Sequence, residues 1–213
     1  IKSANGITTS GGSGNIVVTG SRSYNTNADY LYNGTVVQST GNGLPATNRN
    51  LTIDNAAGVT LTSSTATSGT LTFNAGNVTT NANTLTLGTS ASVLGTLTRT
   101  SGHVVGNFRR WIDNVTTTGI IFPVGTSSIY NGITLDFTAA PTEGSITSRF
   151  DTGFPGVYGL PVSDAGQECT TVGSGWWTMT GANGYSGGTA TLSVLAEGFT
   201  GITDYTLLHL FRR

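Results

Sequence analysis

Residues 50–108 read NLTIDNAAGVTLTSSTATSGTLTFNAGNVTTNANTLTLGTSASVLGTLTRTSGHVVGNF, and their repeats are the strongest indication of the fold. Four phrases in it each place a leucine between two threonines, and these leucines are Leu61, Leu71, Leu85 and Leu97. Alternation with period two is typical of a half-buried β-strand, and the Gly, Ser, Asn and Ala between the phrases favour turns. The stretch therefore predicts short strands joined by tight turns.

The spacing of the phrases suggests how the strands stack. Three interleaved series recur with a period near 25 residues: Leu61 with Leu85; Leu71 with Leu97; and Leu51 with Val78 and then Val104 or Val105. A coil of three short strands and three turns has about this length, and stacked coils bury their in-pointing side chains against one another. We therefore predict a three-faced parallel β-helix in which the members of a series are inward neighbours. Regular short strands also suit an antiparallel β-sandwich, in which Leu61 would pair with Leu71.

Composition limits the classes of function. Only 9% of the residues are charged, against about 25% in ordinary soluble domains, and the net charge is −1. Such a chain has no electrostatic basis for binding nucleic acid or an anionic membrane. We see no signal peptide and no apolar run long enough to span a bilayer, and Met179 is the only methionine. We therefore expect a segment of a longer secreted polypeptide.

Two domains are expected, with a boundary near residue 106. Residues 1–105 would form the solenoid with an N-terminal cap, and they include a strand-like run at residues 16–19. Asn33-Gly34 lies between two strand-like runs, where it predicts either a hairpin turn or a tight corner of the solenoid.

Residues 106–213 differ because they contain most of the large aromatic residues. Strand-like runs continue there with irregular spacing, which favours antiparallel pairing in a β-sandwich. These runs are residues 120–124, 133–137, 145–150, 176–180, 190–195 and 205–210. We expect residues 151–171 to form a long loop, and the sandwich to continue beyond Arg213.

The junction needs a cap, because an open solenoid end exposes apolar side chains and unpaired strand edges. Residues 108–122 begin with Phe108 and include Trp111. We predict that this segment packs on the last coil, that Trp111 covers the coil, and that the two domains form one rigid body. Arg109 and Arg110 would then remain solvated.

We find no carboxylate pair, metal-ligand cluster, phosphate loop or nucleophile–base set in the sequence, and we predict no catalytic residue, cofactor or metal. The candidate ligand platform is aromatic and cationic, as in sites that stack sugars. Its members are Arg109, Arg110, Trp111, Trp176 and Trp177. Alternation along a strand must place one residue of the Trp176-Trp177 pair in the core and the other outward.

The Thr-x-Thr phrases raise a separate hypothesis, ice binding by an ordered array of hydroxyls. Under the predicted coil period, the threonines at 60 and 62 would stack on those at 84 and 86, and those at 70 and 72 on those at 96 and 98. The alternative is that threonine simply suits a pleated, uncharged surface.

A resemblance to a known group is carried by an ordered set of motifs. These are YNGT at residues 32–35, Gln38, TGNGLP at 40–45, NLTI at 50–53, Gly106 with FRR at 108–110, FPVG at 122–125 and Tyr130. Over residues 24–213 this order resembles the repeated extracellular regions of very large Bacteroidetes surface proteins. The resemblance implies an adhesin-like protein at the cell surface, exported by the type IX secretion system. The motifs are structural and bring no catalytic residues with them.

Together these observations predict a non-enzymatic structural or adhesive module of a large secreted protein. Its expected partners are neighbouring domains of the same polypeptide, the secretion machinery and surface glycans, with no nucleic acid and no insertion into a membrane. The alternatives are a carbohydrate-binding module and a β-helix polysaccharide lyase, with ice binding as a third. A lyase would need basic and acidic residues on one exposed face, whereas Lys2 is the only lysine.

Overall fold

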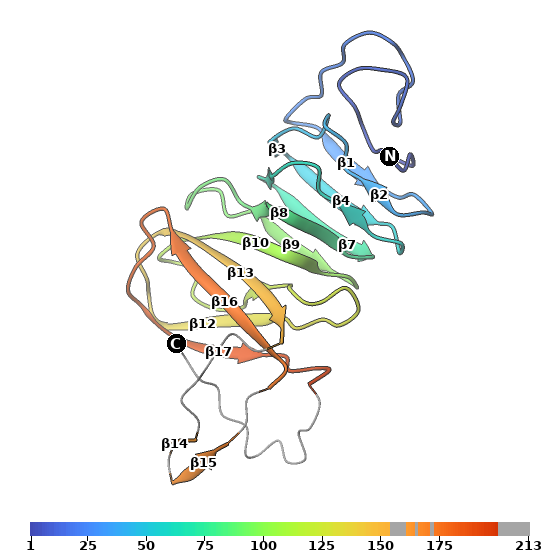
Figure 1. Ribbon diagram of the computed structural model, residues 1–213. Coiled ribbons are helices and arrows are strands. Elements are labelled where there is room, and N and C mark those ends of the chain that lie inside the picture. Colours follow the sequence, from blue (N-terminus) through green and yellow to red (C-terminus); the bar gives the residue numbers. More distant parts are fainter. Residues whose placement is uncertain (154–160, 165, 171–172, 200–213) are drawn as a thin grey trace.

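The computed structural model describes residues 1–153, 161–164, 166–170 and 173–199, and every regular element in these residues is a β-strand (Figure 1). The N-terminal half is a solenoid-like stack of about four turns. An antiparallel region follows it, so the all-β class and the solenoid predicted from the sequence are confirmed.

Three parallel ladders form the sides of the stack. Face 1 contains β1 (Asp29–Tyr32), β4 (Asn50–Asp54), β7 (Thr70–Ala75) and β9 (Thr96–Arg99). Face 2 contains β2 (Gln38–Ser39), β5 (Val59–Thr60) and the first halves of β8 (Val78–Leu87) and β10 (Val104–Ile112). Face 3 contains β3 (Thr47–Asn48), β6 (Thr65–Thr67) and the second halves of β8 and β10.

The predicted period of 25 residues is wrong for most of the stack. Leu51 pairs directly with Leu71, 20 residues later, and paired residues in the first turns are 19 to 21 apart. The last turn is longer, because residues 88–95 add a turn closed by the Ser90–Val93 bridge. The predicted partnership of Leu71 with Leu97 is therefore right, and the one of Val78 with Val104 is right too.

Two other predicted partnerships are wrong. Leu85 pairs with Thr65 and Phe108, whereas the Leu61 N–H donates to the Thr79 carbonyl one turn later. Val78 pairs with Val59 and Val104 rather than Leu51. The sandwich alternative, an antiparallel Leu61–Leu71 pair, is not what the ladders show either, because β4, β7 and β9 are parallel.

Polar side chains inside face 3 explain the wrong period. The inward residues of β3 and β6 are Asn48, Thr65 and Thr67, all buried. The Asn48 amide donates to Thr65 Oγ1 at 2.9 Å, and Thr67 Oγ1 donates to the Asn48 amide oxygen at 3.0 Å. The Thr65 hydroxyl also donates to the Pro45 carbonyl at 2.8 Å, so each of these three buried side chains has hydrogen-bond partners without an apolar residue. Because the inward residues of such a strand are polar, the alternation of apolar residues with threonine does not indicate it in the sequence.

The corners between faces use unusual backbone conformations. In β8 the turn from face 2 to face 3 is at Asn81, with φ of 52°, and in β10 it is at Gly106, with φ of 115°. A Cβ at Gly106 would lie 2.2 Å from Thr80 Oγ1, so glycine is needed there. Asn33-Gly34 also forms a corner rather than a hairpin, because β1 and β2 pair with the next turn and not with each other.

The N-terminal residues cover the first turn. Asn33 N–H donates to the Ile1 carbonyl at 3.0 Å, and Ile7 N–H donates to the Thr40 carbonyl at 3.1 Å. Residues 16–19 form a loop, so the strand predicted there is wrong. The Arg22 guanidinium holds this loop by donating to four backbone carbonyls and one hydroxyl, on Thr8, Gly11, Ile16 and Val18.

The antiparallel region extends face 3 and adds a second sheet. β13 (Gly144–Thr152) pairs with β10, and β16 (Gly175–Ala182) pairs with β13, both antiparallel. The second sheet contains β11 (Ile120–Phe122), β12 (Ile133–Ala139) and β17 (Thr189–Val194). Five of the six predicted strand runs are thus confirmed, and the sixth, residues 205–210, lies outside the described residues.

The predicted loop at residues 151–171 is partly wrong. Its described residues include the hairpin of β14 (Val162–Asp164) and β15 (Gln167–Cys169), and β13 extends to Thr152.

The β-sandwich expected at the C-terminal end is seen in part. In Figure 1, β13 and β16 run diagonally across β12 and β17. Phe108 of β10 meets Phe122 of β11 edge-on at 6.3 Å, and Trp177 Nε1 of β16 donates to the Asn131 carbonyl before β12 at 2.7 Å. Buried residues of the solenoid and of both antiparallel sheets form one cluster.

One strand, β10, joins the two parts. Its residues 104–110 pair with β8 of the solenoid, and its residues 108–112 pair with β13. The boundary predicted at residue 106 therefore falls inside a strand. Phe108 and Phe122 are fully buried, as the predicted packing of residues 108–122 requires. The predicted cap by Trp111 is wrong, because alternation points Phe108 and Ile112 inward and leaves Trp111 half-buried on the outer face.

Candidate functional site

The candidate platform residues lie on two strands of one sheet, and alternation divides them between its two faces. Arg110 and Trp177 point inward, whereas the outward residues are Arg109, Trp111 and Trp176. The five residues therefore do not form a single site. The outer face of the sheet is the part that a ligand can reach.

Arg110 is an inward cation rather than the solvated residue that the sequence suggested. It pairs with Leu87, which is fully buried, and one guanidinium nitrogen donates to the Ile121 carbonyl at 2.9 Å. Burial lowers the pKa of Arg110 to about 10. Its Nε has no hydrogen-bond partner among the described residues. Arg110 thus lies between the two sheets and is partly exposed, apart from the outward candidate residues.

Trp177 points inward and packs, partly buried, against the core, as alternation predicts for one of the two adjacent tryptophans. Its ring packs edge-on against Phe150 at 5.1 Å and stacks on Phe199 at 5.8 Å. Its indole N–H is satisfied by the Asn131 carbonyl. This residue holds β16 on the second sheet and is no sugar platform.

The outer face brings in a residue that the sequence did not single out, Arg149. Arg109 Nε donates to Thr147 Oγ1 at 3.0 Å, and Thr147 is two residues before Arg149 on β13. Arg149 Nε contacts Asp151 Oδ2 at 2.8 Å, with 46% of the Arg149 side chain exposed. Asp151 is the direct partner of Trp176 on β16. The missing signal was the pairing of β10 with β13, which brings residues some 40 positions apart into contact.

These outward residues follow a diagonal across three strands. The order is Trp111, Arg109, Arg149 and Trp176, which we call the aromatic–arginine line. Residues two apart on a strand are separated by ~7 Å, and diagonal cross-strand neighbours by ~7–8 Å, so the line is ~20 Å long. Thr178 and Thr180 beside it are exposed, so this part of the face is open to solvent.

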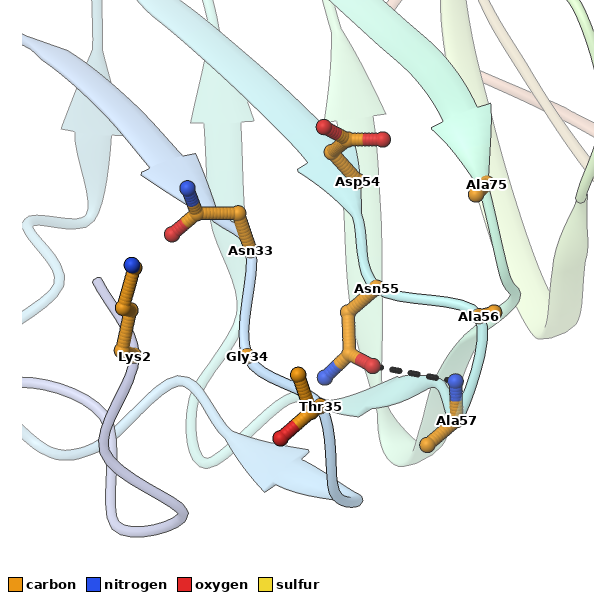
Figure 2. Close-up of a pocket in the computed structure, with 9 residues that line it drawn as sticks. All are labelled: Lys2, Asn33, Gly34, Thr35, Asp54, Asn55, Ala56, Ala57 and Ala75. Carbon is orange, nitrogen blue, oxygen red and sulfur yellow. Dashed lines mark hydrogen bonds between the residues drawn. The ribbon is translucent and has the colours of Figure 1, made fainter.

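A second candidate is a shallow groove of about 500 Å³ at the corner between faces 1 and 2. Figure 2 shows Lys2 on one side, Ala56, Ala57 and Ala75 on the other, and polar side chains between them. These polar side chains belong to Asn33, Thr35 and Asp54. Lys2 and Asp54 are both exposed. The groove offers hydrogen-bonding groups around a small-residue wall, without the desolvated acid or base typical of catalysis.

Two buried amides make the groove rigid. Asn55 donates to the Val36 carbonyl at 2.8 Å and to Gln38 Oε1 at 2.9 Å. Its amide oxygen accepts from Ala57 N–H at 3.0 Å, the bond drawn in Figure 2. Gln38 in turn donates to the carbonyls of Ile1 and Ser3 and accepts from Gly34 N–H. This network joins the N-terminal cap to the first two turns.

An aromatic cluster lies where the last turn meets the antiparallel region. Arg99 lies 3.7 Å above the ring of Tyr130, and the His103 ring is 5.8 Å from the same ring. Burial lowers the pKa of His103; the nearby Arg99 lowers it further, while the bond from its ring to the Thr126 carbonyl opposes the shift. His103 is 5% exposed, so it contacts other residues of the fold and offers little surface to a ligand.

The threonine array is regular on face 1 only. Thr52, Thr72 and Thr98 form one outward column, and Thr70 pairs with Thr96 in the next. The predicted stacking of the threonines at 70 and 72 on those at 96 and 98 is therefore right. The stacking predicted for 60 and 62 on 84 and 86 is wrong, because Thr60 pairs with Thr79 and Thr86 with Ala66.

Within the part of the chain that the structure describes, no three His, Cys, Asp or Glu side chains lie close enough to hold a metal ion. The described residues also include no helix long and apolar enough to cross a membrane. In the comparisons with known proteins, no family model matches the chain, and neither does any curated protein or solved structure.

Proposed function

We propose that the chain is a rigid, non-enzymatic structural or adhesive module of a large secreted protein at the cell surface. Neighbouring domains of the same polypeptide, the secretion machinery and surface glycans would be its partners. The observation that carries the proposal is the sharing of β10 by the solenoid and the antiparallel sheet. The sequence resemblance to Bacteroidetes surface proteins supports the extracellular location.

Rigidity follows from the way the sheet continues. The strands of faces 2 and 3 belong to one eight-stranded sheet with β13 and β16, and β8, β10 and β13 are direct neighbours in it. Bending at this junction would break backbone hydrogen bonds and open the contact between Phe108 and Phe122. A module that holds its shape transmits force and presents a surface at a fixed angle, which is what a spacer or adhesin needs.

Distance measurements between the two parts test the rigidity. Spin labels at Thr72→Cys on face 1 and Thr180→Cys on β16, in a Cys169→Ser background, should give one narrow distance distribution. Adding 20% glycerol or raising the salt should leave it unchanged. A broad or two-peaked distribution would show a hinge and remove the main support for the proposal. A parallel assay for uronate release from polysaccharides tests the non-enzymatic part, because turnover would favour a lyase.

The threonine columns of face 1 favour a second candidate function, ice binding. Neighbouring strands are ~4.8 Å apart. Two water molecules that share a hydrogen-bonded neighbour in a tetrahedral network are ~4.5 Å apart, given bonds of ~2.8 Å. A column such as Thr52, Thr72 and Thr98 could therefore order water along its length. Inhibition of ice recrystallisation should then be lost in Thr72→Lys and kept in Thr79→Lys on face 2; no inhibition by the intact chain rejects this candidate.

A further inference from the structure

We infer that the outer face of the β10–β13–β16 sheet binds an acidic polysaccharide along the aromatic–arginine line. This inference rests on the proposed adhesive function and names the class of ligand. It depends on four outward side chains, those of Trp111, Arg109, Arg149 and Trp176.

The shape of the face suits an extended chain. The strip is open on the β16 side, where Thr178 and Thr180 are exposed and the Arg149 side chain is 46% exposed, whereas beside Trp111 the outward Ser145 is buried. The ~20 Å between the two tryptophans gives room for several consecutive sugar rings. A small compact ligand could touch only part of the line.

The charge of the face favours an anion. Arg109 and Arg149 are diagonal neighbours, so their guanidinium groups can reach the same segment of ligand. Asp151 forms an ion pair with Arg149. Arg109 donates to the Thr147 hydroxyl, and no carboxylate among the described residues forms an ion pair with Arg109. The strip therefore carries an excess positive charge, although the whole chain has a net charge of −1.

The chemistry of the four side chains matches a polymer of acidic sugars. A guanidinium donates two parallel hydrogen bonds to a carboxylate or a sulfate. An indole ring offers a flat apolar surface to the C–H face of a sugar, and its N–H can donate to a hydroxyl. Two arginines are too few for nucleic acid, whose binding requires many phosphate contacts.

Binding of polysaccharides by the full chain tests the inference. Polygalacturonate supplies carboxylates, dextran sulfate supplies sulfates, and dextran is the neutral reference, each titrated in 20 mM and 200 mM NaCl. The variants are Arg109→Gln, Arg149→Gln and Trp176→Ala. The matched control is Arg49→Gln, because Arg49 also makes an exposed ion pair, with Asp29 at 2.8 Å, but lies on the solenoid. Melting curves establish that each variant is folded.

We expect polygalacturonate, dextran sulfate or both to bind, more weakly at the higher salt. Each arginine variant should raise Kd about threefold to tenfold, with Trp176→Ala similar and Arg49→Gln unchanged. Preference for one polymer identifies its anionic group as the recognised one. Equal binding of dextran, equal effects of Arg49→Gln and Arg149→Gln, or no binding by the folded chain would each overturn the inference. None of these failures would bear on the proposed rigid module, whose rigidity is tested by the distance measurements. Uronate release would instead overturn the proposal that the module is non-enzymatic.

Discussion

Replacing Phe108 by alanine should destabilise the solenoid and the antiparallel sheets together. The ring is fully buried, and on β10 it lies between Leu85 of β8 and Ser148 of β13. It also meets the Phe122 ring at 6.3 Å. Truncating a core phenylalanine to alanine costs ~3–5 kcal/mol. In a domain of 150–250 residues each kcal/mol lowers Tm by ~2–4 °C, so a fall of ~6–20 °C is expected.

Two probes monitor the two parts during thermal and urea unfolding. Far-UV circular dichroism reports all strands, whereas tryptophan fluorescence reports the antiparallel region, because all three tryptophans lie on β10 and β16. Both probes should give the same transition in the wild type and in Phe108→Ala.

Trp111→Ala is the matched control for this experiment. Trp111 is on the same strand, but it points outward and lies beyond the last residue paired with β8. Its truncation should cost only about 1 kcal/mol. The reasoning is refuted if Phe108→Ala shifts Tm no more than Trp111→Ala does. It is also refuted if fluorescence and dichroism separate in the wild type, since the two parts would then unfold independently.

Three further outcomes are expected. Gly106→Ala should cost ~1–3 kcal/mol in urea unfolding, because its φ is 115° and the new Cβ would strike Thr80 Oγ1, whereas Gly12→Ala, with open space around it, should have little effect. Asn48→Ala should cost ~2–4 kcal/mol, since it leaves two buried hydroxyls without their amide partner; a smaller loss in a folded variant would mean that water replaces the amide. Because burial lowers the pKa of His103, the unfolded state binds more protons than the folded state near the ordinary pKa of ~6.5. The stabilising effect should therefore be full above that pH and decline as the pH falls below it. His103→Gln should flatten this dependence in urea titrations between pH 4.5 and 8.

Much of the architecture could be predicted from the sequence because strand alternation is a local property. The phrases around Leu71 and Leu97 both belong to face 1, so comparing them gave the right register. The phrases around Leu61 and Leu85 belong to different faces, which no local pattern reveals. The hidden strand was β6, whose inward Thr65 and Thr67 satisfy their hydroxyls with Asn48 instead of packing an apolar side chain.

The candidate site was predictable to a smaller extent. Alternation alone placed one of Trp176 and Trp177 inside, and counting from Phe108 along β10 would have placed Arg110 inside as well. Arg149 could not be found this way, because its relation to Arg109 depends on the register of β10 against β13. That register is a long-range property set by tertiary packing.

Polar contacts inside the solenoid bear on the surface that we propose as the binding face. A slip of one residue between β3 and β6 would move Asn48 away from Thr65 and Thr67, breaking two buried side-chain hydrogen bonds. The cost of such a slip fixes the register of face 3, and β8, β10 and β13 continue that register through one sheet. A change of one residue in the register of β10 against β8, or of β13 against β10, would turn Arg109 or Arg149 inward. The hydrogen bonds of Asn48 thus fix the first turns of face 3, and the pairing of β10 with β8 and β13 keeps the two arginines on the same outer face.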